Sequence, residues 1–210
     1  MRLYLEIDGV INAVYGPRSW VGHVAEGQSP DVFDSVTFDG YTFVWSRELV
    51  RRLVAWAEKD DNEIVWATSW DPQIETLSRI LGFGRTGADA RSLNVRGPRE
   101  GVDGLLGSYV TPFSKMRAIL EDVKAFPVKG DNWVALDPAL SELMDAEGVE
   151  WVANVALTGG DVPPVVSDIG VTPGLMSYIE TYGNIDDWIE SVTFDMFDSL
   201  DGDNEKKWEV

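Results

Sequence analysis

The chain has 210 residues, of which 44% are hydrophobic and nine are Trp, so it is long and apolar enough to bury a sizeable core. It has no Cys and one His, which excludes disulfides, thiolate zinc sites and multi-histidine metal sites within one chain. Its formal net charge of −19 disfavours direct binding to a nucleic-acid backbone and suits solubility or a partner with a basic face. We expect a cytoplasmic protein without membrane contact, because we find neither a signal-peptide pattern nor an apolar run of membrane-spanning length.

The first predicted strand, residues 2–8, ends in two acidic residues. Glu6 and Asp8 are spaced i, i+2, and in an extended strand such residues point to the same side. Gly9 follows them as a turn residue. Ligands of α/β sheets bind at the carboxyl ends of the strands, so two acids there predict a site for metal and phosphate chemistry.

Residues 13–45 are predicted to form an insert after this strand. Gly and Pro fill its first half, where His23 is predicted to be an exposed loop residue. In its second half, Val36–Trp45, β-forming residues stand on both sides of Asp39-Gly40, a favoured type I′ turn. We interpret the insert as a cap that carries a small β-hairpin flap.

The rest of the chain alternates between predicted helices and strands. In chain order these are a helix at 46–59, a strand at 63–67, a helix begun by Asp71-Pro72 and ended by Gly82, a long loop with a possible short strand at 83–112, a helix at 114–124, a strand at 133–137, a helix at 139–146, a strand at 150–155, a Gly/Pro-rich loop at 158–173, and helices at 174–182 and 185–198. This alternation predicts a Rossmann-like, doubly wound parallel α/β sheet in one domain, residues 1–198. Residues 199–210 are predicted to be an acidic C-terminal tail.

Three further polar residues stand where predicted elements begin or end. Thr68 follows the second strand, Lys115 lies near the start of a helix, and Asp137 ends a later apolar strand. Each also has a simpler interpretation: Thr68 and Asp137 could cap the helices that follow them, and Lys115 could be a solvated lysine. Lys124 and Lys129 are rival candidates for the lysine.

The segment Glu6–Asn12 resembles motif I of the haloacid dehalogenase (HAD) superfamily, whose usual form is Asp-x-Asp-Gly-(Val/Thr)-(Leu/Ile)-Asn. Thr68, Lys115 and Asp137 follow in the order of the other superfamily motifs. The flap hairpin, the Val65–Trp70 run and the Gly170–Pro173 turn are most similar to a HAD-like branch found in bacterial and phage proteins and in RNA-repair fusions.

This resemblance implies a HAD-like fold and a Mg²⁺-dependent phosphatase that acts on a small phosphate ester or nucleotide. Glu6 would occupy the position of the nucleophile and metal ligand. Asp8 would be the general acid/base, with its backbone carbonyl on the metal. Thr68 and Lys115 would bind the phosphoryl group, and Asp137 would complete the magnesium site.

Glu6 departs from the family pattern, which has Asp at the nucleophile position. Its side chain is one methylene longer, and a misplacement of about 1 Å can cost roughly a hundredfold in rate. Glu6 could form a glutamyl-phosphate, or serve as a metal ligand that orients water, or pair with Lys115 for structural reasons. The alternative function is a pseudoenzyme, a catalytically inactive HAD-fold binding or assembly protein that uses its acidic surface against a basic partner.

Overall fold

The structure, a computed structural model, describes residues 1–12, 33–38, 40–59, 62–70, 73–83, 90–96, 110–127, 132–147, 149–165, 171 and 173–181. The chain divides into two compact units, Met1–Val171 and Thr172–Val210, each considered by itself. The second unit contains α7 (Pro173–Glu180), within the predicted range 174–182 apart from its first residue. His23, the predicted helix at 185–198 and the acidic tail lie outside the described residues.

A five-stranded sheet forms the centre of the first unit, and its neighbouring strands all pair in parallel. The order across the sheet is β5 (Ala90–Ser92), β4 (Glu63–Trp66), β1 (Arg2–Leu5), β6 (Trp133–Leu136) and β7 (Gly160–Asp161). In the middle of the sheet, Leu3 pairs with Ile64 on one side and Val134 on the other, and all three are fully buried. Near-continuous apolar strands of this kind are typical of a parallel sheet covered on both faces, which confirms the predicted α/β fold.

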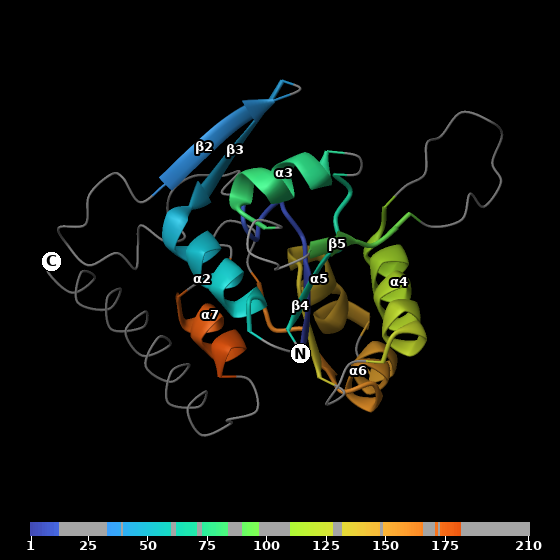
Figure 1. The fold of residues 1–210 in the computed structure, drawn as a ribbon. Helices are drawn as coiled ribbons and strands as arrows, with labels where there is room; N and C mark the ends of the chain where they lie inside the picture. The colour runs from blue at the N-terminus through green and yellow to red at the C-terminus, as the bar shows by residue number, and fades with distance from the viewer. Residues whose placement is uncertain are drawn as a thin grey trace, which may run out of the picture. The chain divides into compact units, whose positions relative to one another are not determined.

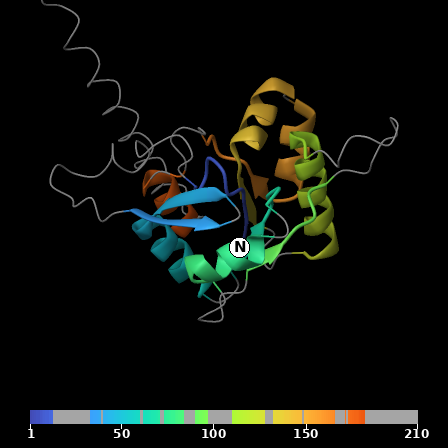
Figure 2. The same cartoon turned by 90° about the horizontal axis from the view of Figure 1, so that it is seen from above.

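Five helices connect the strands of this unit within the described residues. They are α2 (Arg47–Ala57), α3 (Ile74–Leu81), α4 (Pro112–Ala125), α5 (Pro138–Glu147) and α6 (Val149–Leu157). Figures 1 and 2 show α2 and α3 gathered on one side of the unit and α4, α5 and α6 on the other. The chain therefore winds outward from β1 in both directions, as a Rossmann-like sheet requires.

The core on the α4–α6 side is built around Trp133, which is fully buried at the start of β6. Its ring meets Tyr4 edge-on, with 5.8 Å between the ring centroids. The chain also passes this ring so closely that a Cβ atom on Gly160 would lie 2.1 Å from the indole. Glycine at this position of β7 therefore allows the edge strand to pack against Trp133.

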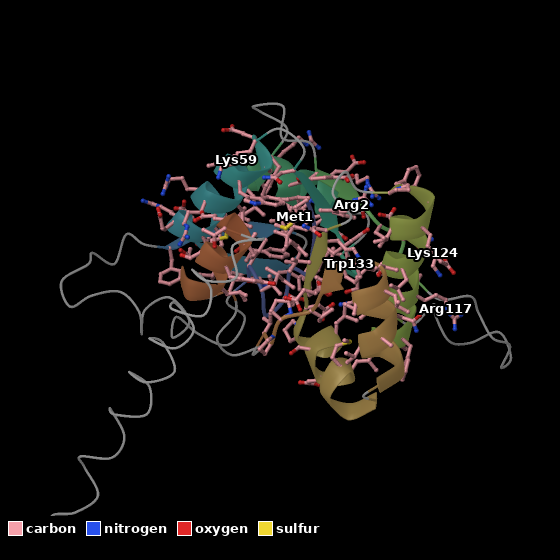
Figure 3. The ribbon with its side chains drawn as sticks, turned by 90° about the horizontal axis from the view of Figure 1, so that it is seen from below. Met1, Arg2, Lys59, Arg117, Lys124 and Trp133 are labelled. Carbon is pink, nitrogen blue, oxygen red and sulfur yellow. The ribbon has the colours of Figure 1, made fainter. Side chains whose placement is uncertain are left out.

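An ion-pair network ties α4 to the amino end of the sheet. Asp122 on α4 accepts hydrogen bonds from Tyr4 (2.7 Å), Arg2 (3.2 Å) and both terminal nitrogens of Arg91. Glu63 bridges Arg2 and Arg91, with 2.6 Å to each. Figure 3 views this end of the sheet, with Arg2 labelled at the start of β1. The network therefore holds α4 against the amino end of the sheet, away from the carboxyl ends of the strands.

The predicted hairpin is present as a two-stranded antiparallel sheet, β2 (Phe33–Phe38) and β3 (Tyr41–Ser46). Gly40 in its turn has φ +79°, a left-handed conformation that favours glycine. Ser46 then caps α2 by accepting a hydrogen bond from the Leu49 backbone N–H at 3.2 Å. A function of the hairpin as a flap stays a prediction.

The predictions for residues 150–155 and for the start of α3 are wrong. Residues 150–155, predicted as a strand, lie within α6, because a short apolar run with Trp and Val suits either period. The helix expected to begin at Asp71-Pro72 begins at Ile74, after Gln73, whose side chain makes no capping bond. Asp71 and Pro72 themselves lie outside the described residues.

Strand β7 was also not predicted, because it lies within the loop expected at 158–173, and β1 ends at Leu5 and not at residue 8. The remaining described elements lie close to their predicted ranges. Gly82 ends α3 with φ +102°, as expected for a glycine cap. The short strand β5 lies within the predicted long loop. None of the helices in the described ranges combines the length and the apolar character that a bilayer span needs.

Candidate active site

The first predicted site segment forms a tight turn directly after β1. The strand ends at Leu5, and the carbonyl of Ile7 accepts hydrogen bonds from the backbone N–H groups of Ile11 (3.0 Å) and Asn12 (2.9 Å). Gly9 allows the turn with φ +72°. Because the extended backbone stops before Asp8, the two carboxylates of Glu6 and Asp8 have different partners. Glu6 is buried, and Asp8 is half-buried.

Glu6, Thr68, Lys115 and Asp137 form one hydrogen-bonded group, named here the carboxylate–lysine cluster. The Lys115 ammonium donates to Glu6 Oε2 and, at 2.6 Å, to Asp137 Oδ2. The Thr68 hydroxyl donates to Glu6 Oε1. All four residues are at most 7% exposed. Every interaction within the cluster is therefore shielded from solvent. In this buried environment charges act on one another more strongly than in water.

The parallel sheet brings these residues together. Glu6, Thr68 and Asp137 follow the neighbouring strands β1, β4 and β6, and the backbone N–H of Glu6 donates to the Leu136 carbonyl at 3.0 Å. Lys115 comes from the first turn of α4. That turn is fixed by a capping box between Thr111 and Ser114. The carboxyl edge of the sheet thus collects side chains from four distant segments.

Asp137 caps the helix that follows it, as one of its two interpretations predicted, and its second oxygen belongs to the cluster. Its Oδ1 accepts hydrogen bonds from the backbone N–H groups of Ala139 (2.8 Å) and Leu140 (3.4 Å) at the start of α5. Its Oδ2 accepts from Lys115. The cap fixes the rotation of the carboxylate, so the second oxygen is directed into the cluster.

The cluster holds two buried carboxylates and one ammonium. Burial raises the pKa of Glu6 above its ordinary value of 4.5, and it outweighs the lowering by Lys115, while Asp137 raises this pKa further. Burial lowers the pKa of Lys115, but the negative charges of Glu6 and Asp137 outweigh burial and raise it. Lys115 therefore stays charged at neutral pH, and it cannot neutralise both carboxylates at once.

Asp8 belongs to a second group of contacts, beside the cluster. Its Oδ2 accepts a hydrogen bond from the indole Nε1–H of Trp70, and its Oδ1 accepts one from the Asn12 side-chain amide, each at 2.8 Å. The sequence identified Trp70 only as the last residue of the Val65–Trp70 run, and Asn12 only as the last residue of the motif-like segment. The hydrogen bonds could not be read from spacing, because they depend on how the turn after β1 packs against the end of β4.

Magnesium is the metal that these donors would suit. Among the described residues no three His, Asp or Glu side chains gather as a metal-binding group. Glu6 and Asp137 nevertheless direct carboxylate oxygens toward one cation, the Lys115 ammonium. Mg²⁺ takes hard oxygen ligands and is often bound by one or two carboxylates together with water and substrate phosphate. The pair fits that pattern, and metal binding here stays a prediction.

Comparison of the chain with protein-family models, curated proteins and solved structures finds no match. A functional proposal therefore rests on the geometry of the site. That geometry offers a carboxylate pair for a cation, a hydroxyl and an ammonium that can donate to an oxyanion, and a separate carboxylate held by neutral donors.

Proposed function

We propose that the protein is a magnesium-dependent hydrolase of small phosphate esters or nucleotides with a HAD-like fold. The observation that carries the proposal is the convergence of Glu6, Thr68, Lys115 and Asp137 in one buried cluster. These residues come from four segments, at the carboxyl edge of three central strands and the first turn of a helix. Their order along the chain is the order that the superfamily resemblance implies.

The charge balance of the site supports a role for a divalent cation. Glu6 and Asp137 share the single ammonium of Lys115, and Asp8 adds a third carboxylate whose two donors are neutral. Even with Asp8 protonated, two carboxylates and one ammonium would repel a phosphate anion. Magnesium held by Glu6 and Asp137 would offset this negative charge and polarise a phosphoryl oxygen.

The protein's own groups would then act on the phosphoryl group. Lys115 and Thr68 would turn their N–H and O–H donors to its oxygens, where charge develops during transfer. A Glu6 oxygen would bond to phosphorus as the ester P–O bond breaks, and Asp8, in its protonated form, would give its proton to the leaving oxygen. As a carboxylate it would then take a proton from the water that attacks next. Water would hydrolyse the resulting acyl phosphate, returning the free carboxylate and releasing inorganic phosphate.

A second candidate function has an observation of its own. Glu6 already accepts three hydrogen bonds, from the Ile7 backbone N–H at 2.7 Å, from Thr68 and from Lys115. A carboxylate with every partner supplied by the protein also suits a HAD-fold binding protein without turnover. Such a protein would use its acidic surface against a basic partner.

Phosphatase turnover separates these functions. We would measure hydrolysis of an aryl phosphate and a nucleotide panel, with Mg²⁺ and with chelator, for the native protein, Glu6→Asp and Asp8→Asn. The hydrolase predicts Mg²⁺-dependent turnover that disappears in Asp8→Asn. Glu121→Gln, on the exposed face of α4, is the matched control and should keep native turnover. If the native protein, Glu6→Asp and Asp8→Asn all fail to hydrolyse any of these substrates, the result would contradict the hydrolase and favour the binding protein.

Ligand binding can be tested apart from turnover. A ligand that binds only the native state raises stability by mass action, by about 2.7 kcal/mol at a hundred times its Kd. Mg²⁺ together with vanadate, a phosphate analogue, should raise the melting temperature of the native protein and fail to raise that of Asp137→Asn. An equal shift in both proteins would place the ligand outside the cluster.

A further inference from the structure

Both oxygens of the Asp8 carboxylate are fixed by side chains outside the carboxylate–lysine cluster. The Trp70 indole donates to Oδ2 and the Asn12 amide donates to Oδ1, each at 2.8 Å. Two donors on different oxygens define the plane of the carboxylate as well as its position. Asp8 is therefore more tightly oriented than a half-buried carboxylate in contact with water alone.

Both donors are in turn held by the hairpin strand β3. The Val44 backbone N–H donates to Asn12 Oδ1 at 3.0 Å, which directs the amide nitrogen of Asn12 toward Asp8. The rings of Phe43 and Tyr41 meet Trp70 edge-on, with centroids 4.5 Å and 5.2 Å away. Strand β3 thus contacts both residues that donate to Asp8: it hydrogen-bonds Asn12 and packs aromatic rings against Trp70.

The hairpin presents both rings on one side of β3. Tyr41 and Phe43 are two residues apart on β3 and so lie on the same side of the strand. Phe43 is buried, and β3 continues directly into the capped first turn of α2 at Ser46. Packing alone would explain the ring contacts, but it would not require two N–H donors to converge on one carboxylate.

We propose that Trp70 and Asn12 are positioning residues through which strand β3 sets the orientation of the Asp8 carboxylate for proton transfer to the leaving group. The catalytic part of this role rests on the proposed function. A proton donor must lie within hydrogen-bond reach of the leaving oxygen, and a misplacement of about 1 Å can cost roughly a hundredfold in rate.

The contacts can be tested without any activity. In the ¹⁵N-labelled full chain, the indole resonance of Trp70 is identified by its absence in Trp70→Phe. Asp8→Ala should move this indole resonance and the Val44 amide resonance, which reports through Asn12. The indole of Trp133, which donates to the Thr158 carbonyl at 3.1 Å, should stay in place as the internal control. If the Trp70 and Val44 resonances both stay in place, the positioning role is overturned.

The catalytic part is tested by leaving-group dependence. An alkyl phosphate needs a proton on its leaving oxygen, whereas a nitrophenyl phosphate hardly does. Trp70→Phe should lower kcat on the alkyl ester by about tenfold or more, with KM unchanged and a much smaller effect on the nitrophenyl ester, since general acid catalysis contributes about 10²–10⁴-fold in full. Asn12→Ala should show the same pattern.

Trp66→Phe is the matched control, because it removes an indole donor that bonds Ser78 at 3.3 Å in the core. It should lower stability and leave the ratio of the two kcat values native. A native ratio in Trp70→Phe would overturn the positioning role even if the enzyme is active. If neither the native protein nor Glu6→Asp hydrolyses either ester, the proposed function fails, and the catalytic part fails with it. The indole shift then decides separately whether β3 holds Asp8.

Discussion

Replacing Lys115 with Met should sharply destabilise the protein at neutral pH. The substitution keeps most of the aliphatic volume of the side chain and removes the ammonium that lies between Glu6 and Asp137. Two carboxylates whose side chains are 8% and 3% exposed would then lose their shared cation. Removing one partner of a buried ion pair is costly because the remaining charge is left without compensation.

The size of the effect follows from distance and burial. At an effective dielectric constant of about 20, unit charges 2.6 Å apart, as in the Lys115–Asp137 pair, attract by roughly 6 kcal/mol. The variant no longer has to bury an ammonium, and this avoided desolvation penalty offsets part of the lost attraction. We therefore expect a net loss of about 3–5 kcal/mol in the free energy of unfolding. For a chain of this length, that loss corresponds to a fall of about 6–20 °C in melting temperature.

The assay is urea and thermal unfolding followed by circular dichroism. Lys124→Met is the matched control: Lys124 lies on the same helix, on its outer side (Figure 3), and its loss should change stability by less than about 0.5 kcal/mol. Equal losses in the two variants would refute a charge-paired Lys115.

The pH dependence of the Lys115→Met effect has a definite sign. Burial raises the pKa of Glu6 in the folded state above 4.5, so its contribution to stability is present at lower pH and is lost as the pH rises through the folded pKa. Without the ammonium of Lys115 this pKa rises further. The difference in stability between the native protein and Lys115→Met should therefore narrow as the pH falls toward 4.5. If this difference in stability widens as the pH falls, the charge pairing of Glu6 with Lys115 is contradicted.

Two further substitutions test the fold away from the site. Gly160→Ala would place a Cβ atom 2.1 Å from the ring of Trp133, so we expect a loss of about 1–3 kcal/mol in urea unfolding; a native midpoint would mean that β7 does not pack against this ring. Asp122→Asn should cost about 3 kcal/mol at neutral pH, because it removes the shared buried anion of the Arg2 and Arg91 network. Burial alone would raise the pKa of Asp122, but hydrogen bonds from Arg91 and Tyr4 lower it below 3.8. The stabilisation that the Asp122 carboxylate provides is thus present above pH 3.8 and is lost as the pH falls through the folded pKa. The stabilities of the native protein and Asp122→Asn should therefore converge in strong acid. Thermal unfolding measured across pH would check this.

Local patterns were sufficient for the elements that carry the site. The strands β1, β4 and β6 are short apolar runs that end in polar residues, and each was predicted to within three residues at either end. In a parallel sheet the carboxyl ends of such strands meet at one edge, so the approach of Glu6, Thr68 and Asp137 follows from topology alone. The segment at 150–155 failed because its apolar residues fit both periods, and tertiary packing selected the helix.

The contacts of Asp8 were beyond sequence reasoning for a different reason. Spacing predicted that Glu6 and Asp8 share a side of an extended strand, but the backbone turns at Ile7 and sends Asp8 toward Trp70 and Asn12. Where the hairpin lies against that turn depends on packing between distant segments, which no local pattern encodes. The network around Asp122 is hidden in the same way, because it requires the pairing of β1, β4 and β5 to be known first.

The longer side chain of Glu6 is accommodated by folding back toward its own backbone. Its Oε1 accepts from the N–H of Ile7, the next residue, at 2.7 Å, while the same carboxylate still contacts Thr68 and Lys115. The extra methylene therefore does not carry the carboxylate away from the two residues that the superfamily resemblance assigns to the phosphoryl group. If Glu6 is to act on phosphorus, the Lys115 ammonium must first leave it for the phosphate, and a cation between Glu6 and Asp137 would permit that exchange without leaving two buried charges unpaired. On this physical ground, metal binding and catalysis at this site should be gained or lost together.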